Sequence, residues 1–177
     1  MNITYRETDF DSLIDCELLA GWYNDPKIKH LYSLFSDAKG YETKFTAEYF
    51  QRTGGNYPIG VTNRNLIVLL DGVPIGQATF EIDTPKLLTR TQNTAWLALV
   101  IGSDDHKRKG IGKEITKHLE YLAAEAGAER IEIGVFEYNH RALSFFTSQG
   151  YLEFTRRENR VWWDGKMWSI VQLLKEL

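Results

Sequence analysis

The chain has 177 residues, of which 43% are hydrophobic and 13% aromatic, and its 21 basic and 24 acidic residues give a formal net charge of −3. This composition is typical of a packed globular protein and argues against a dedicated nucleic-acid binder. No apolar run approaches the roughly 18 residues of a membrane helix, and no secretory signal is visible. Since Cys16 is the only cysteine, an intramolecular disulfide is excluded. We expect one cytoplasmic domain over residues 1–177, a monomer or homodimer with no nucleic-acid or membrane partner.

The first half of the chain predicts short elements with clear stop signals. In chain order, these are a strand at 3–6, a helix at 11–23, a helix at 46–52, and a β-hairpin with strands at 65–70 and 73–82. Asp25-Pro26 ends the first helix, and Gly54-Gly55 ends the second. The Asp71-Gly72 pair is typical of the tight turn of a hairpin. Polar residues 84–92 then connect to the next strand.

A phosphate-binding pattern follows the apolar strand at 97–101. The loop after this strand becomes basic at 107–109, and Gly110 and Gly112 accompany the start of an amphipathic helix near Ile111. Glycines let backbone N–H groups approach a ligand closely, and a helix N-terminus offers unpaired N–H donors with a partial positive charge. The combination predicts a phosphate or pyrophosphate site. Taken alone, the same loop could be an ordinary basic surface loop.

A second strand and a short helix complete this pattern. Apolar residues alternate over 130–137, which predicts a strand, and Asn139 is placed to cap a helix over 140–148. This strand and the preceding one should be parallel and joined by a right-handed crossover. The chain closes with a second predicted hairpin, whose strands run over 154–163 and 166–174.

Other ligand-binding patterns fit the loop less well. A Walker A loop needs a glycine five residues before the Gly112-Lys113 pair and a Ser or Thr after it, but Lys107 and Glu114 stand there. A dinucleotide fingerprint needs a third glycine, where this chain has Ile115. Residues 104–106, Asp-Asp-His, have no further ligand at metal spacing, so we expect a solvated loop and no metal.

Two motifs resemble those of the GCN5-related N-acetyltransferase (GNAT) superfamily. Residues 107–112, KRKGIG, resemble its acetyl-CoA motif Arg/Gln-x-x-Gly-x-Gly/Ala, with Lys107 in place of the first Arg or Gln. Residues 139–151 resemble its Asn-x-x-Ala-x-x-x-Tyr-x-x-x-Gly-Phe segment. Upstream, residues 22–26, WYNDP, are similar to a stretch of the ribosomal-protein-alanine acetyltransferase-like branch. The resemblance implies the α+β GNAT fold: a mixed, mostly antiparallel central sheet flanked by helices, with a parallel, splayed strand pair at the cofactor site.

The resemblance also implies where acetyl-CoA, the acyl donor, would bind. The end of the 97–101 strand would offer backbone groups to the pantetheine arm, residues 107–113 would hold the pyrophosphate, and Asn139 would hydrogen-bond the pantetheine. Asn139 could instead act only as a helix cap, and the phenylalanines of the last motif could be core residues. The implied cofactor-binding residues are Leu99, Val100, Ile101, Lys107, Arg108, Lys109, Gly110, Ile111, Gly112, Lys113, Asn139, Ala142, Phe145 and Phe146.

The sequence departs from the family at its catalytic groups. Phe146 stands where the family often has a tyrosine that protonates the leaving thiolate, and the strand at 97–101 has no Glu or His to serve as a base. Glu81, acting through a water, and Tyr138 are the remaining candidates for the base. A glutamate on a sheet more often faces solvent, and this is the plainer expectation for Glu81.

The acceptor should be an amine, which must lose a proton before it can attack a thioester. The resemblance implies direct acetyl transfer in a ternary complex to a protein N-terminus, a polyamine, an aminoglycoside or another small amine. The aromatic-rich segment 22–58 is expected to shape the acceptor pocket, through cation–π contacts or as core. Because of Phe146, the alternative is a catalytically silent CoA-binding or regulatory module on the same fold.

Overall fold

The structure is a computed structural model, and it describes residues 2–102 and 109–177. The predicted pyrophosphate ligands Lys107 and Arg108 lie outside the described residues, as does the acidic loop segment 104–106.

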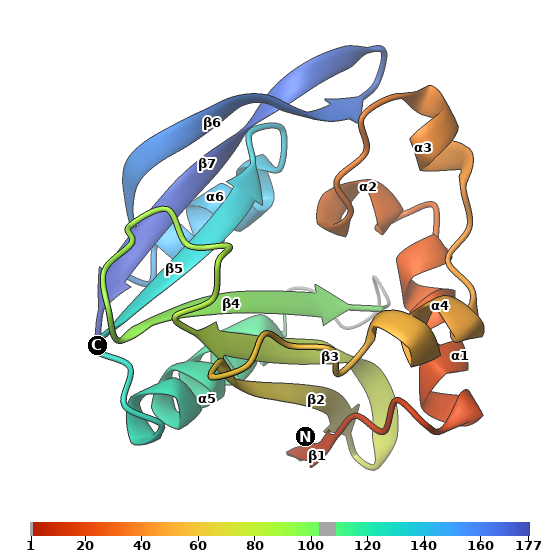
Figure 1. The fold of residues 1–177 in the computed structure, drawn as a ribbon, viewed down its shortest axis with the longest axis horizontal. Coiled ribbons are helices and arrows are strands. Elements are labelled where there is room, and N and C mark those ends of the chain that lie inside the picture. Colours follow the sequence, from red (N-terminus) through yellow and green to blue (C-terminus); the bar gives the residue numbers. More distant parts are fainter. Residues whose placement is uncertain (1, 103–108) are drawn as a thin grey trace.

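One seven-stranded sheet forms the centre of the fold, in the order β1-β2-β3-β4-β5-β7-β6. Its neighbouring strands are antiparallel except for β4 and β5, which are parallel. This confirms the predicted mixed, mostly antiparallel sheet (Figure 1). The strands are β1 Ile3–Glu7, β2 Thr62–Leu70, β3 Val73–Ile82, β4 Thr94–Ile101, β5 Arg130–Phe136, β6 Leu152–Trp163 and β7 Lys166–Glu176.

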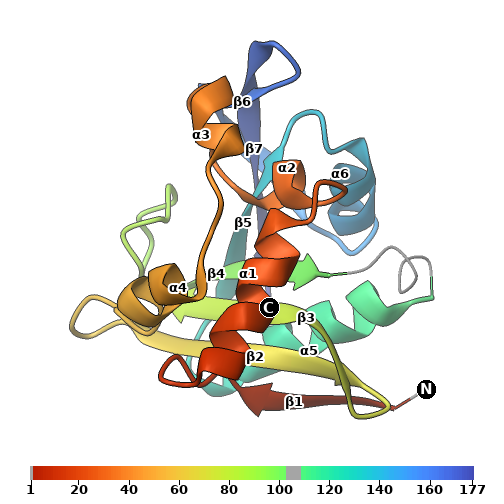
Figure 2. The same cartoon turned by 90° about the vertical axis from the view of Figure 1, so that its right-hand side faces the viewer.

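Helices cover both faces of the sheet (Figure 2). They are α1 Leu13–Asn24, α2 Lys29–Tyr32, α3 Ala38–Glu42, α4 Ala47–Thr53, α5 Ile111–Glu125 and α6 His140–Thr147. Because side chains alternate along a strand, Leu66 and Val68 of β2 enter the main core with α5, whereas Ile67 packs with α1 and α4 on the opposite face. Among the described residues, no helix combines the length and apolar character needed to cross a membrane.

The two predicted hairpins and the strand–helix–strand–helix pattern are confirmed, with shifted ends. β2 begins at Thr62 rather than at 65, and the strand before the phosphate loop begins at Thr94. Helices α2 and α3 were not predicted, because elements of four and five residues are too short to show a 3.6-residue periodicity.

The parallel pair is short and opens into a gap. Its register covers only Thr94 with Arg130, Ala95 with Ile131 and Trp96 with Glu132. Beyond Trp96 the two strands diverge, so the β5-facing edge of β4 has no strand partner from there to Ile101. The expected splayed strand pair is therefore present. The two segments predicted to bind acetyl-CoA, the N-terminus of α5 and Asn139, follow β4 and β5 along the chain.

Candidate active site

The backbone of β4 alternates between its neighbour β3 and the open gap. Gly102 N–H donates to the Ile75 carbonyl at 2.8 Å. Along an antiparallel strand, the backbone groups of successive residues point alternately to one neighbour and to the other, so this bond shows which β4 residues are bonded to β3. Val100 is therefore bonded to β3, where it pairs with Gln77, while the backbone groups of Leu99 and Ile101 point into the gap. Of the three predicted backbone contacts to the pantetheine arm, the structure supports Leu99 and Ile101. It directs the Val100 groups elsewhere, because a strand exposes only every second residue along one edge.

A cavity of about 480 Å³ lies along this open edge, between β4, α5 and α6. It brings together most of the predicted cofactor-binding residues and adds several from α2 and the end of α6 that the sequence did not indicate. Its lining residues are Leu31, Tyr32, Leu99, Ile101, Gly110, Gly112, Lys113, Asn139, Arg141, Ala142, Phe145, Phe146, Ser148 and Gln149.

The N-terminus of α5 forms one end of this cavity. Gly110 has φ 79°, a left-handed conformation that favours glycine, and it starts the helix. Ile111 can offer only its backbone N–H, because its side chain is buried in the core. A Cβ on Gly112 would lie 3.5 Å from the Phe145 ring, so the glycine keeps this end open. Lys113 lines the cavity, whereas Lys109 is exposed and does not.

Asn139 serves as a cap and also lines the cavity. Its side-chain oxygen accepts from Ala142 N–H at 3.2 Å at the start of α6. Its amide N–H₂ group has no hydrogen-bond partner among the described residues and remains able to donate to a ligand. The two predicted roles are therefore geometrically compatible.

Tyr32, at the end of α2, reaches the open edge of β4. Its hydroxyl accepts from Ile101 N–H at 3.4 Å, the group that points into the gap. Burial raises the pKa of Tyr32, and the Ile101 N–H and the charge of Arg141 partly oppose that rise. On the same cavity wall, the Phe146 ring packs 4.9 Å from Phe145 and 5.3 Å from Tyr151, centroid to centroid. The aromatic-rich segment 22–58, expected to shape the acceptor pocket, includes Tyr32, but Tyr32 lines the cofactor cavity instead. The sequence did not indicate this place, because α2 has one turn and lies about seventy residues from the strand it contacts.

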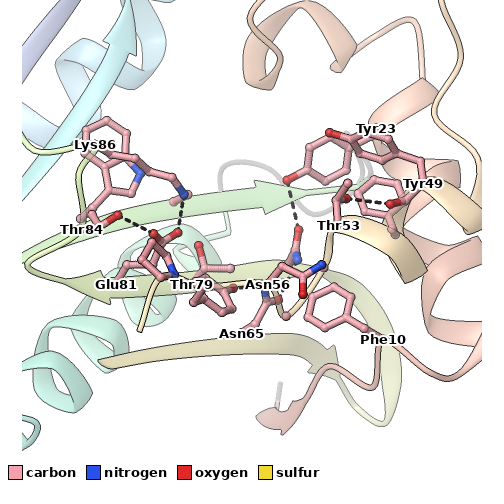
Figure 3. Close-up of a pocket in the computed structure, with 18 of the residues that line it drawn as sticks. Phe10, Tyr23, Tyr49, Thr53, Asn56, Asn65, Thr79, Glu81, Thr84 and Lys86 are labelled. Atoms are coloured by element: carbon pink, nitrogen blue, oxygen red, sulfur yellow. Dashed lines mark hydrogen bonds and ion pairs between the residues drawn. The ribbon is translucent and has the colours of Figure 1, made fainter. Parts of the chain in front are cut away.

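A second cavity, also of about 480 Å³, lies on the opposite face of the sheet (Figure 3). The predicted acceptor segment supplies much of its wall. The lining residues are Phe10, Tyr23, Phe45, Tyr49, Phe50, Thr53, Gly54, Gly55, Asn56, Tyr57, Pro58, Asn65, Gln77, Thr79, Glu81, Thr84, Pro85, Lys86, Trp96 and Ala98.

A chain of hydrogen bonds fixes the floor of this second cavity. The Tyr23 hydroxyl donates to the Gln77 side-chain oxygen at 3.1 Å, and the Gln77 amide donates to Asn65 at 2.7 Å. The Asn65 amide in turn donates to the Tyr57 hydroxyl at 3.0 Å. The side-chain oxygens of Gln77, Asn65 and Tyr57 each accept one of these bonds. The Tyr57 hydroxyl proton has no acceptor among the described residues and can serve a ligand.

Glu81 of β3 carries the only carboxylate among the described residues that line the second cavity. It is 5% exposed, so the expectation of a solvent-facing glutamate is wrong. The segment after β3 covers it: the Thr84 hydroxyl donates to one carboxylate oxygen at 2.8 Å, and the Lys86 ammonium pairs with the other. Figure 3 shows both partners converging on Glu81.

Comparisons with known proteins agree with this arrangement. Residues 27–151 match the model of the acetyltransferase (GNAT) family, which is most of the chain. The chain belongs to the GNAT acetyltransferase family. It is thus an N-acetyltransferase, and acetyl-CoA is the donor substrate of this family. No curated protein matches the sequence.

Several solved GNAT structures share the fold at low sequence identity. An N-acetyltransferase from Staphylococcus aureus has a TM-score of 0.72 at 15% identity, with 99% of both chains covered. A Salmonella typhimurium protein described as an acetyltransferase, solved with its cofactor acetyl-CoA, has 0.71 at 16%, covering 100% of this chain and 95% of its own. The ribosomal-protein-alanine N-acetyltransferase from Brucella melitensis has 0.69 at 17%, with both chains fully covered at 100%. At these identities the likeness concerns the fold alone.

The described part of this GNAT enzyme fits acetyl-CoA chemically. The unpaired edge of β4 can pair with the amides of a pantetheine arm as a further strand would, and the first turn of α5 offers free N–H donors for phosphate oxygens. No group of three or more potential metal-binding side chains occurs within residues 2–102 and 109–177.

The other candidate base, Tyr138, lies outside both cavities. Its hydroxyl donates to the His30 carbonyl, and burial raises its pKa. Its ring packs 5.4 Å from Trp168 and 5.6 Å from Phe136, centroid to centroid. The geometry therefore favours Glu81 over Tyr138 as the residue near an acceptor.

Proposed function

We propose that this GNAT enzyme transfers the acetyl group of acetyl-CoA directly to a primary amine within a ternary complex. The observation that carries the proposal is that both cavities share β4. Trp96 and Ala98 line the second cavity, whereas Leu99 and Ile101 line the first. A donor lying along the open β4 edge and an acceptor on the other face would meet at the gap beyond Trp96.

The donor would occupy the cavity between β4, α5 and α6. The pantetheine amides would pair with the backbone of Leu99 and with the Ile101 carbonyl, since Ile101 N–H donates to Tyr32. The Asn139 amide would donate to a pantetheine oxygen. The N–H groups of the first turn of α5, with Lys113 beside them, would hold the pyrophosphate, because the helix dipole favours anions there.

The acceptor would be a monoamine with an apolar body, or a peptide N-terminus. Aromatic rings form much of the second cavity, and the only charged side chains among its described lining residues are Glu81 and Lys86, which form an ion pair. A cavity with balanced charges offers no cluster of carboxylates for a polyamine or an aminoglycoside. The acidic residues of the aromatic-rich segment 22–58 do not supply one, since none of them lines the cavity: they are Asp25, Asp37, Glu42 and Glu48.

Two further features support direct transfer. The Cys16 thiol, on α1, is fully buried and donates to the Phe10 carbonyl at 3.4 Å, and burial raises its pKa. It is therefore unsuited to form an acetyl-enzyme, since the thiolate is the nucleophile. Glu81 would accept the proton that the amine sheds, directly or through a water, once the acceptor separates it from Lys86.

The test is acetyl-CoA turnover with a panel of monoamines, short peptides, polyamines and aminoglycosides, followed by mass spectrometry of the enzyme incubated with acetyl-CoA alone. We expect N-acetylated monoamine or peptide products and no acetylated Cys16. Binding of acetyl-CoA without turnover of any amine would instead support the silent CoA-binding module. An acetylated Cys16 that passes its group to an amine would overturn direct transfer.

A further inference from the structure

Tyr32 lies in the cavity that would hold acetyl-CoA, beside the open edge of β4. It lines the cofactor cavity together with Phe146, the position at which the family often has its tyrosine. Its hydroxyl lies at Ile101 N–H, on the edge of β4 that opens toward the pantetheine arm. The hydroxyl oxygen is thus anchored by a backbone donor, and its proton has no acceptor among the described residues.

Three other hydroxyl groups near this cavity are already engaged. The Ser148 hydroxyl donates to the Phe145 carbonyl at 2.7 Å, and the Tyr151 hydroxyl donates to Glu120 at 2.8 Å. Tyr138 donates to the His30 carbonyl. Tyr32 is consequently the only described tyrosine that both lines the cavity and retains a free proton.

We propose that Tyr32 is the general acid of acetyl transfer, a catalytic role moved from α6 to α2. This inference rests on the proposed function. As the amine nitrogen bonds to the acetyl carbon, the carbon–sulfur bond breaks and its electron pair stays on sulfur. The sulfur then takes the proton of the Tyr32 hydroxyl. The tyrosinate then regains a proton from solvent, which balances the proton that the amine has shed.

The surroundings of Tyr32 stabilise the anion that this step leaves. Ile101 N–H donates to the hydroxyl oxygen, and the Arg141 guanidinium lies on the same cavity. Both interactions favour the tyrosinate and oppose the effect of burial on its pKa. Phe146 cannot supply a proton. Its ring, which also lines the cavity, would limit the space around the sulfur and would not compete with Tyr32 as a hydrogen-bond donor.

The decisive variants are Tyr32→Phe and the double variant Tyr32→Phe with Phe146→Tyr. Removing the hydroxyl should lower kcat by about 10²-fold, the lower end for a general acid, because a thiolate is already a tolerable leaving group. The second change restores a hydroxyl to the same cavity, at the position where the family often has its tyrosine, and should recover part of the lost kcat. Tyr41→Phe in α3 is the matched control, since Tyr41 lines neither cavity, and it should leave kcat unchanged.

A binding measurement tests the same contact without turnover. Titration of CoA bound to each variant, followed through thiolate absorbance, should give a higher thiol pKa in Tyr32→Phe than in the natural enzyme, because a hydrogen-bond donor to the thiolate is lost. Calorimetry should show similar affinities for CoA, and thermal unfolding should confirm folding.

Unchanged kcat and unchanged thiol pKa in Tyr32→Phe would overturn the proposal. Tighter CoA binding with unchanged kcat would also overturn it, showing that Tyr32 merely occupies the strand edge. Failure of the natural enzyme to acetylate any amine would refute the proposed function, while the thiol titration would still decide whether Tyr32 contacts the sulfur.

Discussion

Trp96 and Gly134 face each other where β4 and β5 begin to separate, and the indole fills the space that a side chain at 134 would need. A Cβ on Gly134 would lie 2.8 Å from the indole Cη2 and 3.1 Å from Ile170. Trp96 is the last β4 residue paired with β5 and also lines the second cavity. The glycine thus lets one indole close the narrow end of the gap and form part of the acceptor wall.

Gly134→Ala should therefore destabilise the fold and impair acceptor binding. Overpacking of this kind costs about 1–3 kcal/mol, and displacement of Trp96 should raise KM for the amine while leaving CoA affinity unchanged. Urea unfolding and steady-state kinetics measure the two effects. Gly21→Ala in α1 is the control, because no atom lies within 4 Å of its Cβ position, and it should stabilise the protein by up to about 1 kcal/mol. Equal stability of the two variants would contradict the packing argument.

The sequence predicted the elements whose signals are local. The Asp71-Gly72 turn has positive φ at both residues, 49° and 82°, as an Asp-Gly hairpin turn requires. The amphipathic α5 and the Asn139 cap were likewise visible as periodicity and residue type. Such features involve residues a few positions apart, so a single sequence contains them in full.

Contacts between distant segments could not be predicted in the same way. Glu81 is buried because Thr84 and Lys86 turn back over it, which alternation along β3 does not reveal. Tyr32 meets Ile101 only once α2 is placed beside the gap. Val100 was grouped with its neighbours because which strand edge a residue faces depends on the register with β3.

The pair formed by Arg6 and Asp15 should govern acid stability. Both Asp15 oxygens accept from the Arg6 guanidinium at 2.6 Å, and Asp9 N–H donates at 3.0 Å. These bonds hold the pKa of Asp15 below its ordinary value, against the effect of burial. Because the folded-state pKa is lowered, the stabilisation is present above the unfolded-state value of about 3.9 and is lost as pH falls through the folded-state pKa.

Asp15→Asn should cost about 1–3 kcal/mol at neutral pH, since it removes a buried, bidentate acceptor. It should also flatten the loss of stability below about pH 4. Urea unfolding between neutral and acidic pH measures both effects. A variant whose stability falls with acid as steeply as that of the natural protein would show that other carboxylates dominate.

Asn139→Asp separates capping from cofactor binding. A carboxylate retains the acceptor for Ala142 N–H, so the free energy of unfolding should change little. The variant lacks the amide donor that faces the cavity, so acetyl-CoA affinity should fall by roughly 10-fold, the worth of one hydrogen bond. Calorimetry measures the affinity for acetyl-CoA, and thermal unfolding measures the stability. A destabilised variant with normal affinity would limit Asn139 to its cap.

Gly112→Val should weaken CoA binding through the phosphate end of the cavity. The added methyl groups would extend toward Phe145, whose ring lies 3.5 Å from the Cβ position, and would block approach to the first turn of α5. Gly110→Val should weaken binding too, but φ 79° there adds backbone strain, so Gly112 is the cleaner site. Affinity for S-acetylpantetheine, which lacks the pyrophosphate, should fall less than that for acetyl-CoA. Equal losses for both ligands would place the pyrophosphate elsewhere.

Glu81→Gln should slow amine acetylation more at low pH than at high pH. Solvent deprotonates more of the amine as pH rises, so a base contributes less there, while at low pH the loss should reach about 10²-fold in kcat/KM. Lys86→Met is the matched control, because it also breaks the ion pair but leaves the carboxylate, 5% exposed, in the cavity. That variant should keep its kcat and bind cationic amines more tightly, since Glu81 is no longer neutralised. Initial rates of both variants, measured across pH, test this prediction. If Glu81→Gln is slowed equally at every pH, the ion pair only shapes the cavity and the amine loses its proton to another group.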